Sequence, residues 1–535
     1  MPLRIGNVSG ATGDHPQAMH RMAYHGNVNI IVGDWLSEMN IAWNAISKSQ
    51  DPEVGFEQGF LDQLDTCLDR ILEQGIKVIT NAGALNTPAL AAKVESLCRD
   101  RGYEGVTVAQ VLGDDISDLV REKPGNVTGL QHLDHEEWVL GEWEFEPHCG
   151  VAYIGAWRIV EALKAGADIV VCGRVTDADS WDELAGALVA GRLNLIECGA
   201  YVTGANFSGF KSLPDLVDLA FPIAELSRDG TCVITKCEKY AGAMTRENTI
   251  AQLLYELQGE LYLNPDVVAD LSNISIQQLD RDRVRVQGIT GLPPPPTTKA
   301  MIAAPAGYQA EATFYINGLD IARKAQTMRN QLEHTFTGHT FSKLSQQAGT
   351  VRPRVFAQAR RKEDISADKF KIPIYALRMQ SYPDGRVIQA PSPSQTREYP
   401  VQRPSYETRS PISLSHFGPT QCAPLGSIVH ARSGDKADNS NIGFFVRHKD
   451  EYPWLQSFLT VPRLKELFAD DWPKDSEPAV ERCEFPEICA VHFRVLDFLG
   501  IASSSRIDGL GKGVGEYLRS AVVDIPVKFL ERGWI

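Results

Sequence analysis

The sequence contains no apolar stretch that approaches the roughly 20 residues a helix needs to cross a bilayer. It contains no block of basic residues either, because Asp and Glu total 68 against 53 Lys and Arg, a formal net charge of −15. An acidic chain of this kind is poorly suited to bind nucleic acid or an anionic membrane. We therefore expect neither as a partner, although a local basic pocket for a small anion is compatible with the composition.

The ten cysteines are scattered and include no C-x-x-C pair. Several lie inside apolar runs, such as Cys172 and Cys232, which suits reduced, buried thiols better than a disulfide framework. The first residues lead directly into an apolar run, without the charged and apolar regions of a secretory signal. We expect a cytoplasmic protein.

Common cofactor and nucleophile motifs are missing as well. The turn Ser9–Asp14 can bind an anion through backbone N–H groups, but it matches neither a dinucleotide fingerprint nor a P-loop. The sequence has no G-x-S-x-G of an α/β-hydrolase. His132, His135 and His148 lie near acidic residues that indicate a solvated face rather than a metal site. We expect no metal ion and no required cofactor.

What is present, in the first half of the chain, is an alternation of short apolar runs with amphipathic segments. At 535 residues the chain is long enough for two or more domains. The alternation predicts a Rossmann-like α/β domain with a mostly parallel sheet and helices on both faces. The predicted strands are 3–8, 28–32, 77–80, 106–112, 169–171 and 195–199, and the clearest helices are 60–72 and 89–101.

The stretch Gly166–Trp181 concentrates charge behind one of these strands. Its apolar run is too short for a helix and is typical of a buried parallel strand, and Arg174 and Asp177 follow it closely. Ligands of open α/β sheets bind outside the carboxyl ends of the strands. The two residues therefore indicate a binding site, or else an ion pair with each other that rigidifies the turn.

Polar residues follow almost every predicted strand, and in a parallel sheet these positions meet at one edge. They are Asn7, Asp14, Asp34, Glu38, Asn81, Asp114, Arg174, Asp177, Glu197 and Asn206. Their convergence predicts an active-site crevice.

The residue types at this edge suggest acid–base chemistry. Crowding among carboxylates raises one pKa toward neutrality, so we expect proton transfer by a carboxyl group. The candidates are Asp34, Glu38, Asp177 and Glu197. We expect the substrate to be bound by Asn81, Arg174, Asn206 and Lys236. The two cations among them can hold a carboxylate or a developing enolate, and the alternative for each is a structural ion pair at a strand end.

The Pro-, Ser- and Arg-rich stretch 384–412 has no periodicity and is the best domain boundary in the chain. It divides the chain into an α/β domain, 1–383, a linker, 384–415, and a smaller α+β domain of ferredoxin-like type, 416–535. In the last domain we expect strands at 425–432, 442–446, 490–495 and 527–530, and helices near 464 and at 514–523.

Two polar loops of this last domain, 433–441 and 503–513, are further candidates for substrate binding. Their candidate residues are Asp435, Lys436, Arg506 and Lys512. The second loop precedes a predicted helix with glycines and a lysine, which suits an anion, although an ordinary helix start has the same composition.

Several motifs in one order resemble the acyclic terpene utilisation (AtuA-like) family. They are Gly166–Asp177, Ile196–Gly199, Gln252–Glu256, Pro265–Asp270, Arg432–Lys436 and Asp508–Lys512. The resemblance covers the whole chain and implies the family's N-terminal domain and its C-terminal ferredoxin-like domain. It also implies a role in the breakdown of branched terpenoid acids through coenzyme A thioesters, or in related secondary metabolism.

The sequence departs from the family pattern in places. Leu193-Asn194 stands where a Gly-His pair is expected, and Gly204-Ala205 and Ala241-Gly242-Ala243 stand where paired glycines are expected. Asn194 removes a titratable imidazole from the predicted crevice rim, which leaves room for a different chemistry or substrate.

Together these features predict a lyase, hydratase or hydrolase that acts by acid–base chemistry on a branched carboxylic acid or its acyl thioester. Coenzyme A would enter only as part of the substrate. The alternative is a non-catalytic small-molecule binding or scaffold protein. We also expect a homo-oligomer, because an exposed ferredoxin-like sheet is a common docking surface, an argument from fold analogy.

The division into domains predicts where a protease will cut first. Because 384–412 lacks any pattern that would bury it, limited proteolysis should cleave there and release two resistant fragments. Mass spectrometry of the early fragments checks this. A resistant linker with early cuts inside 1–380 would contradict the division.

Overall fold

The computed structural model describes residues 2–10, 13–122, 130–176, 195–227, 231–313, 323–324, 326–327, 330–331, 354–373, 380–381, 395–436, 438–473, 477–499, 511–533 and 535. Two predicted site residues, Asp177 and Arg506, lie outside these ranges, as do Asn194 and residues 384–394 of the predicted linker. Within the described residues, no helix is long and apolar enough to cross a membrane.

The centre of the molecule is a sheet in the order β13-β14-β10-β9-β1-β2-β3-β7-β4-β18. Its middle strands are parallel: β1 (Leu3–Asn7), β2 (Ile30–Gly33), β3 (Lys77–Thr80), β7 (Ile169–Cys172) and β4 (Val108–Val111). These are the first five strands that the sequence predicts, within two or three residues at each end. The α/β class is therefore confirmed, but the sheet is mixed rather than mostly parallel, because five antiparallel strands flank the five parallel ones.

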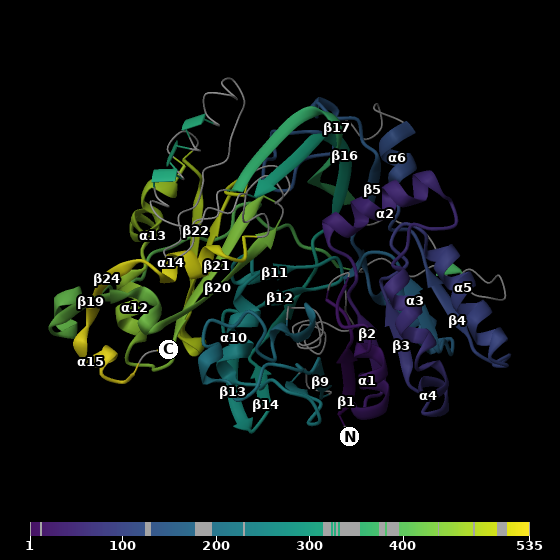
Figure 1. Ribbon diagram of the computed structural model, residues 1–535, viewed down its shortest axis with the longest axis horizontal. Helices are drawn as coiled ribbons and strands as arrows, with labels where there is room; N and C mark the ends of the chain where they lie inside the picture. The colour runs from purple at the N-terminus through teal and green to yellow at the C-terminus, as the bar shows by residue number, and fades with distance from the viewer. Residues whose placement is uncertain are drawn as a thin grey trace.

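The two faces of the parallel strands are covered differently, because side chains alternate along each strand. Ile169 and Val171 pack in a cluster with apolar residues of four helices, and Val170 and Cys172 pack on the opposite side. The four helices are α1 (Ala18–His25), α3 (Gln58–Asp65), α4 (Leu68–Glu73) and α5 (Thr87–Asp100). The opposite face is covered by α8 (Trp157–Lys164), by α6 (Ser117–Glu122) and by residues of strands outside this sheet. Figure 1 shows α3, α4 and α5 grouped beside β3 and β4.

Antiparallel strands extend the sheet on both sides of its parallel centre. Beyond β1 they are β9 (Pro222–Leu226), β10 (Cys232–Lys236), β14 (Arg283–Gln287) and β13 (Ser275–Asp280). At the other edge, β18 (Gln380–Ser381) pairs with β4. The helix α10 (Arg246–Leu254) packs on the antiparallel flank through a large apolar cluster.

The predicted sixth strand at 195–199 is wrong. Cys198 and Gly199 both have left-handed backbone angles, with φ of 57° and 60°, so the chain bends into the short helix η2 (Gly199–Tyr201). Leu195 and Ile196 are apolar because they pack in the cluster under α10, not because they belong to the sheet. The predicted helix 60–72 is likewise two helices, α3 and α4, which are separated at Thr66 and Cys67.

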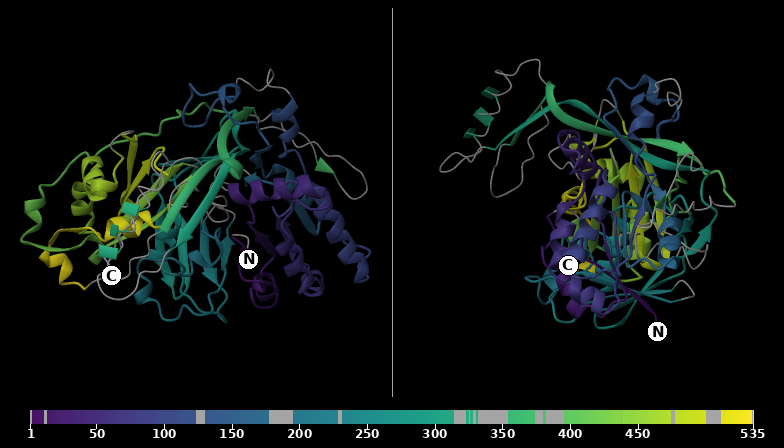
Figure 2. Two further views of the ribbon diagram at one scale, coloured as in Figure 1. Left: turned by 45° about the horizontal axis from the view of Figure 1, so that its top comes forward. Right: turned by 90° about the vertical axis from the view of Figure 1, so that its right-hand side faces the viewer.

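A long antiparallel pair brings distant residues to the sheet's edge. It consists of β16 (Thr297–Thr313) and β17 (Arg354–Pro373), and β16 also pairs with β5 (Cys149–Ala152). In Figure 1 this pair arches between the parallel strands and the C-terminal domain, and Figure 2 shows its curve from two further sides. Its first residues are tied to the end of β5, since Tyr153 N–H donates to the Lys299 carbonyl at 2.8 Å.

The C-terminal domain contains a four-stranded antiparallel sheet in the order β20-β21-β23-β22. The strands are β20 (Val429–Lys436), β21 (Asn439–Val446), β22 (Val480–Phe485) and β23 (Ala490–Val495). One face packs in an apolar cluster with α12 (Tyr452–Phe458), α13 (Val461–Phe468) and α14 (Val514–Arg519). A separate pair joins β19 (Thr420–Pro424) to β24 (Val522–Pro526).

Two predictions for this domain need correction. The polar stretch 433–441 is not a loop, because β20 runs to Lys436 and β21 begins at Asn439, which leaves a tight hairpin. The predicted last strand, 527–530, is the helical turn α15 (Val527–Leu530), and the strand is β24 just before it.

The second face of the C-terminal sheet is not exposed. Phe445 and Phe485 belong to the apolar cluster under α10, and a Cβ on Gly443 would lie 2.4 Å from the Leu254 side chain. The helix α10 is thus sandwiched between the two sheets. The expectation that an exposed ferredoxin-like sheet supports a homo-oligomer loses its basis, because this chain covers that face itself.

The second half of the predicted linker, 395–412, is held by both domains. Arg397 N–H donates to the Pro294 carbonyl at 2.9 Å, and Arg403 N–H donates to Glu481 at 2.9 Å. The Ser405 hydroxyl accepts from Arg482 N–H at 3.0 Å. These contacts fix the chain as it passes from the first domain to the second.

Candidate active site

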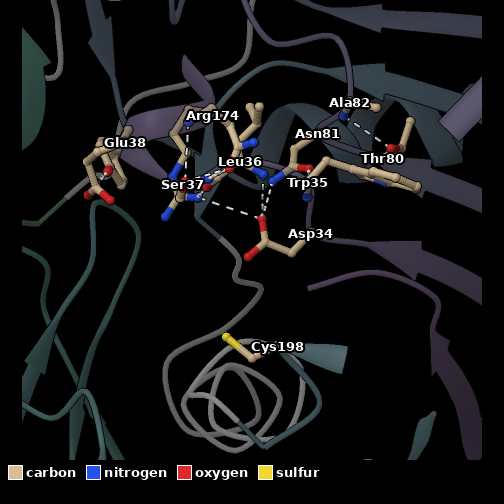
Figure 3. Close-up of polar contacts among 12 residues, drawn as sticks. Asp34, Trp35, Leu36, Ser37, Glu38, Thr80, Asn81, Ala82, Arg174 and Cys198 are labelled. Carbon is tan, nitrogen blue, oxygen red and sulfur yellow. Dashed lines mark hydrogen bonds and ion pairs between the residues drawn. The ribbon is translucent and has the colours of Figure 1, made fainter. Parts of the chain in front are cut away.

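Loops at the carboxyl ends of β2 and β3 are joined by Asn81 (Figure 3). Its side-chain Nδ2 donates to Asp34 Oδ1 at 2.5 Å, and its Oδ1 accepts from Trp35 N–H at 2.8 Å. Asn81 therefore holds the loop after β2 in place. Asp34 Oδ1 also lies 3.7 Å from Arg174 Nη1, which brings the end of β7 into the same group.

Arg174 is the centre of this group and is only 8% exposed. Its Nη1 donates to the Leu36 carbonyl, its guanidinium carbon lies 4.5 Å from the centroid of the Tyr153 ring, and its Nε has no hydrogen-bond partner. Burial lowers the pKa of Arg174, but Tyr153, Asp34 and Glu38 together hold it above the usual value. The Arg174 side chain is therefore permanently charged, and its Nε–H has no hydrogen-bond acceptor.

Glu38 is the first residue of α2 (Glu38–Gln50), whose start is fixed by a capping box between Ser37 and Asn40. Its Oε1 accepts from the Tyr153 hydroxyl at 2.7 Å and lies 3.7 Å from Lys299 Nζ. Burial and the charge of Glu38 raise the pKa of Tyr153 far above its usual value. Tyr153 is therefore a protonated donor.

Asp114, at the end of β4, lies behind Arg174. Its Oδ2 accepts from Arg174 N–H at 2.8 Å, and a Cβ on Gly173 would come within 1.8 Å of the same oxygen, so glycine is needed there. Burial raises the pKa of this carboxyl to about 7, against a smaller lowering by the Arg174 N–H. With 3% exposure it positions the Arg174 backbone rather than meeting a ligand.

The bend at 195–199 reaches the same edge although it is not a strand, because Asn7 Nδ2, at the end of β1, donates to the Ile196 carbonyl at 2.5 Å. This places Glu197 and Cys198 near the crevice, where Figure 3 shows Cys198 facing the Asp34 group. The Cys198 thiol lies 2.6 Å from the Tyr255 hydroxyl. Burial, with Glu197 and the neighbouring Glu256, raises the pKa of the thiol well above its usual value, so it stays protonated.

The β20–β21 hairpin of the C-terminal domain adds Asp435 and Lys436. Lys436 Nζ donates to Glu256 Oε2, directly after α10. Burial, Glu256 and Glu38 raise the pKa of the half-buried Asp435 to about 7, while Lys512 and Lys436 lower it. The effect of Glu38 on Asp435 joins the two domains electrostatically.

Two further electrostatic effects link the strand-end loops with the rest of the group. Glu197 helps to raise the pKa of Arg174, and the charge of Lys436 acts on the pKa of Tyr153. The charges of the loops and of the C-terminal hairpin therefore influence each other.

The structure brings most of the predicted site residues together. They are Asp34, Glu38, Asn81, Arg174, Glu197, Asp435, Lys436 and Lys512. Lys236 lies apart from them: it donates to the Tyr240 carbonyl at 2.8 Å and lies 3.7 Å from Asp282. Asn206 contributes its backbone carbonyl, which accepts from Arg432 Nη1 at 2.6 Å. Lys236 therefore closes a turn beyond β10, and a role in substrate binding is not supported for it.

Sequence reasoning assigned no role to several residues of the site. Tyr153 and Lys299 reach it through the pairing of β5 with β16, which no local pattern signals. The sequence did offer an indication for Tyr255 and Glu256, because they are the last two residues of the family motif Gln252–Glu256. Among the described residues, no group of three His, Cys, Asp or Glu side chains is arranged to hold a metal ion.

The fold and the site define a two-domain α/β protein with a cluster of charged residues where the strand-end loops meet the C-terminal hairpin. Residues 3–412 match the model of the acyclic terpene utilisation family protein AtuA, and residues 423–524 match that of the AtuA ferredoxin-like domain. The chain belongs to the AtuA family, and the resemblance drawn from its motifs is confirmed. None of the curated proteins matches the chain.

The burial of Asp114 predicts a pH-dependent stability. A carboxyl whose pKa is raised by folding contributes stability that is lost as the pH rises through about 7. Asp114→Asn keeps an acceptor for Arg174 N–H without a proton to lose. Its melting temperature should match that of the wild type near pH 5 and exceed it by about 2–5 °C at pH 8.

Differential scanning fluorimetry between pH 5 and pH 8 measures this difference. Asp118→Asn is the matched control, because the Asp118 side chain is 84% exposed, and it should follow the wild type. A difference between Asp114→Asn and wild type that does not change with pH would contradict the raised pKa.

Proposed function

We propose that the protein is an enzyme that performs acid–base chemistry on a branched carboxylic acid or its acyl thioester, within acyclic terpene utilisation. One observation carries the proposal. Asp435 is half-buried beside Lys436, which donates to Glu256, and burial with the charges of Glu256 and Glu38 raises the pKa of Asp435 to about 7. A carboxyl group that titrates near neutral pH can both accept and donate a proton during turnover.

The surrounding residues suit the other demands of such a reaction. Arg174 carries a buried positive charge and one N–H without a partner, which fits a substrate carboxylate or a developing oxyanion. Tyr153 adds a protonated hydroxyl beside it. The crevice thus combines a proton acceptor with groups that stabilise negative charge.

The proposed step begins with a proton transfer. Asp435 removes a proton from the carbon next to the acyl carbonyl, the C–H electron pair forms a C=C bond, and the carbonyl π pair moves to the oxygen, where Arg174 stabilises the enolate. Collapse of the enolate expels a leaving group from the next carbon, and the reverse sequence adds water to a double bond. Lyase and hydratase activity share this step.

Activity is tested by incubating the pure protein with a panel of branched acids and acyl thioesters and detecting products by mass spectrometry. The wild type should convert at least one compound, with a rate that rises as the pH increases through about 7, because the base must be ionised. Asp435→Asn should lower turnover by roughly 10²–10⁴-fold. Asp118→Asn again serves as the exposed control.

Binding without conversion across the panel would instead favour a non-catalytic binding or scaffold protein. Full activity of Asp435→Asn would exclude Asp435 as the proton-transfer group.

Two conservative variants test the rest of the crevice. Arg174→Lys keeps the charge but loses the planar guanidinium, so substrate binding should weaken while the melting temperature is retained. Glu197→Gln keeps size and hydrogen bonding but removes a proton-transfer group, so turnover should fall by about 10²–10⁴-fold if Glu197 takes part. Calorimetric binding and single-turnover assays separate the two effects. If Glu197→Gln and Asp435→Asn both stay fully active, the charged rim is structural.

A further inference from the structure

Arg432, on β20, is a buried cation with an unfilled donor. Only 6% of it is exposed, and its Nη1 donates to the Asn206 carbonyl at 2.6 Å. Its Nη2 is buried and has no hydrogen-bond partner. The guanidinium carbon lies 4.8 Å from the centroid of the Tyr201 ring and 5.4 Å from that of Tyr255. A buried N–H without an acceptor is unfavourable, so its position needs an explanation.

Lys512 lies over the same two rings. Its Nζ is 5.0 Å from the Tyr201 centroid and 5.6 Å from the Tyr255 centroid. Burial lowers the pKa of Lys512, but Cys198, Tyr201, Glu256 and Asp435 together raise it above the usual value, so the ammonium stays charged.

Arg432 and Lys512 differ from the neighbouring Lys436 in their ion pairing. Lys436 forms an ion pair with Glu256, whereas neither Arg432 nor Lys512 forms one within the described part of the chain. Asp435 holds its proton up to about pH 7 and gives little compensation below it. Two like charges over shared aromatic rings are stable together only when the rings and a further anion offset their repulsion.

We propose that Arg432 and Lys512, with the rings of Tyr201 and Tyr255, form a binding site for an oxyanion, a second anionic group of the substrate. The proposal rests on the proposed function and extends it, because Arg174 would hold the reacting end of the molecule and this site its distant end. The shared ligand chemistry is a carboxylate or phosphate oxygen pair, which an arginine fork binds through two N–H groups. The source is either a second carboxyl group of a branched diacid or a phosphate of coenzyme A.

Isothermal titration calorimetry of the full-length protein tests the site without turnover. The probes are inorganic phosphate, 3-methylglutarate and coenzyme A. Arg432→Gln and Lys512→Met should each weaken binding by about 10- to 100-fold, the effect of losing a charge-assisted hydrogen bond to a buried anion. Lys164→Met is the control, because the Lys164 side chain is 63% exposed and its substitution should leave affinity unchanged.

Arg432→Lys keeps the experiment decisive if Arg432→Gln does not fold. It retains the charge but loses the fork, so binding should still weaken, and melting temperatures show whether each variant is folded. Site-dependent binding of 3-methylglutarate supports the proposal and identifies a carboxylate. Site-dependent binding of coenzyme A without the diacid also supports it and identifies a phosphate. No binding of any probe, or equal affinity in wild type and folded variants, overturns it.

The outcome is separable from that of the activity assay. If no product forms but anion affinity falls in Arg432→Gln, the enzyme proposal fails and the site stands. If product forms at the wild-type rate in Arg432→Gln and its anion affinity is unchanged, the site fails and the enzyme proposal stands.

Discussion

The burial of the Arg174 guanidinium is the interaction on which the rest of the site depends. A cation removed from water is stable only when acceptors and negative charge surround it. The loop after β2 supplies them through Asp34 and the Leu36 carbonyl. Asn81 after β3 holds Asp34 in place, and Asp114 after β4 holds the Arg174 backbone. The parallel sheet places the residues that follow its strands at one edge, where they surround Arg174.

The C-terminal domain contributes Asp435 and Lys436 to the site. Its sheet packs on α10, which fixes the β20–β21 hairpin beside the residues that follow that helix. The hairpin then places Asp435 close enough to Glu38 for the two carboxyl groups to influence each other. Crowding of carboxylates across a domain junction is unfavourable unless cations share the space, and Lys436 and Lys512 provide them. Charged residues therefore contribute to the contact between the two domains, in addition to the apolar cluster under α10.

Local sequence pattern was sufficient for the parallel strands and for the position of Arg174, because short apolar runs followed by charge are a property of neighbouring residues. It failed at 195–199, where the left-handed angle of Cys198 turns an apolar run away from the sheet. It also missed Tyr153 and Arg432, whose roles depend on contacts with segments more than a hundred residues away. Such residues follow from pairing and domain docking, which periodicity does not encode.

The most direct test of a single site shared by two domains is a crystal structure with a bound branched acid or acyl thioester. We expect the ligand to contact Arg174 from the first domain and at least one of Asp435, Arg432 or Lys512 from the second. A ligand seated elsewhere, such as the pocket lined by Phe207, His430 and Arg447, or one that contacts only a single domain, would contradict it.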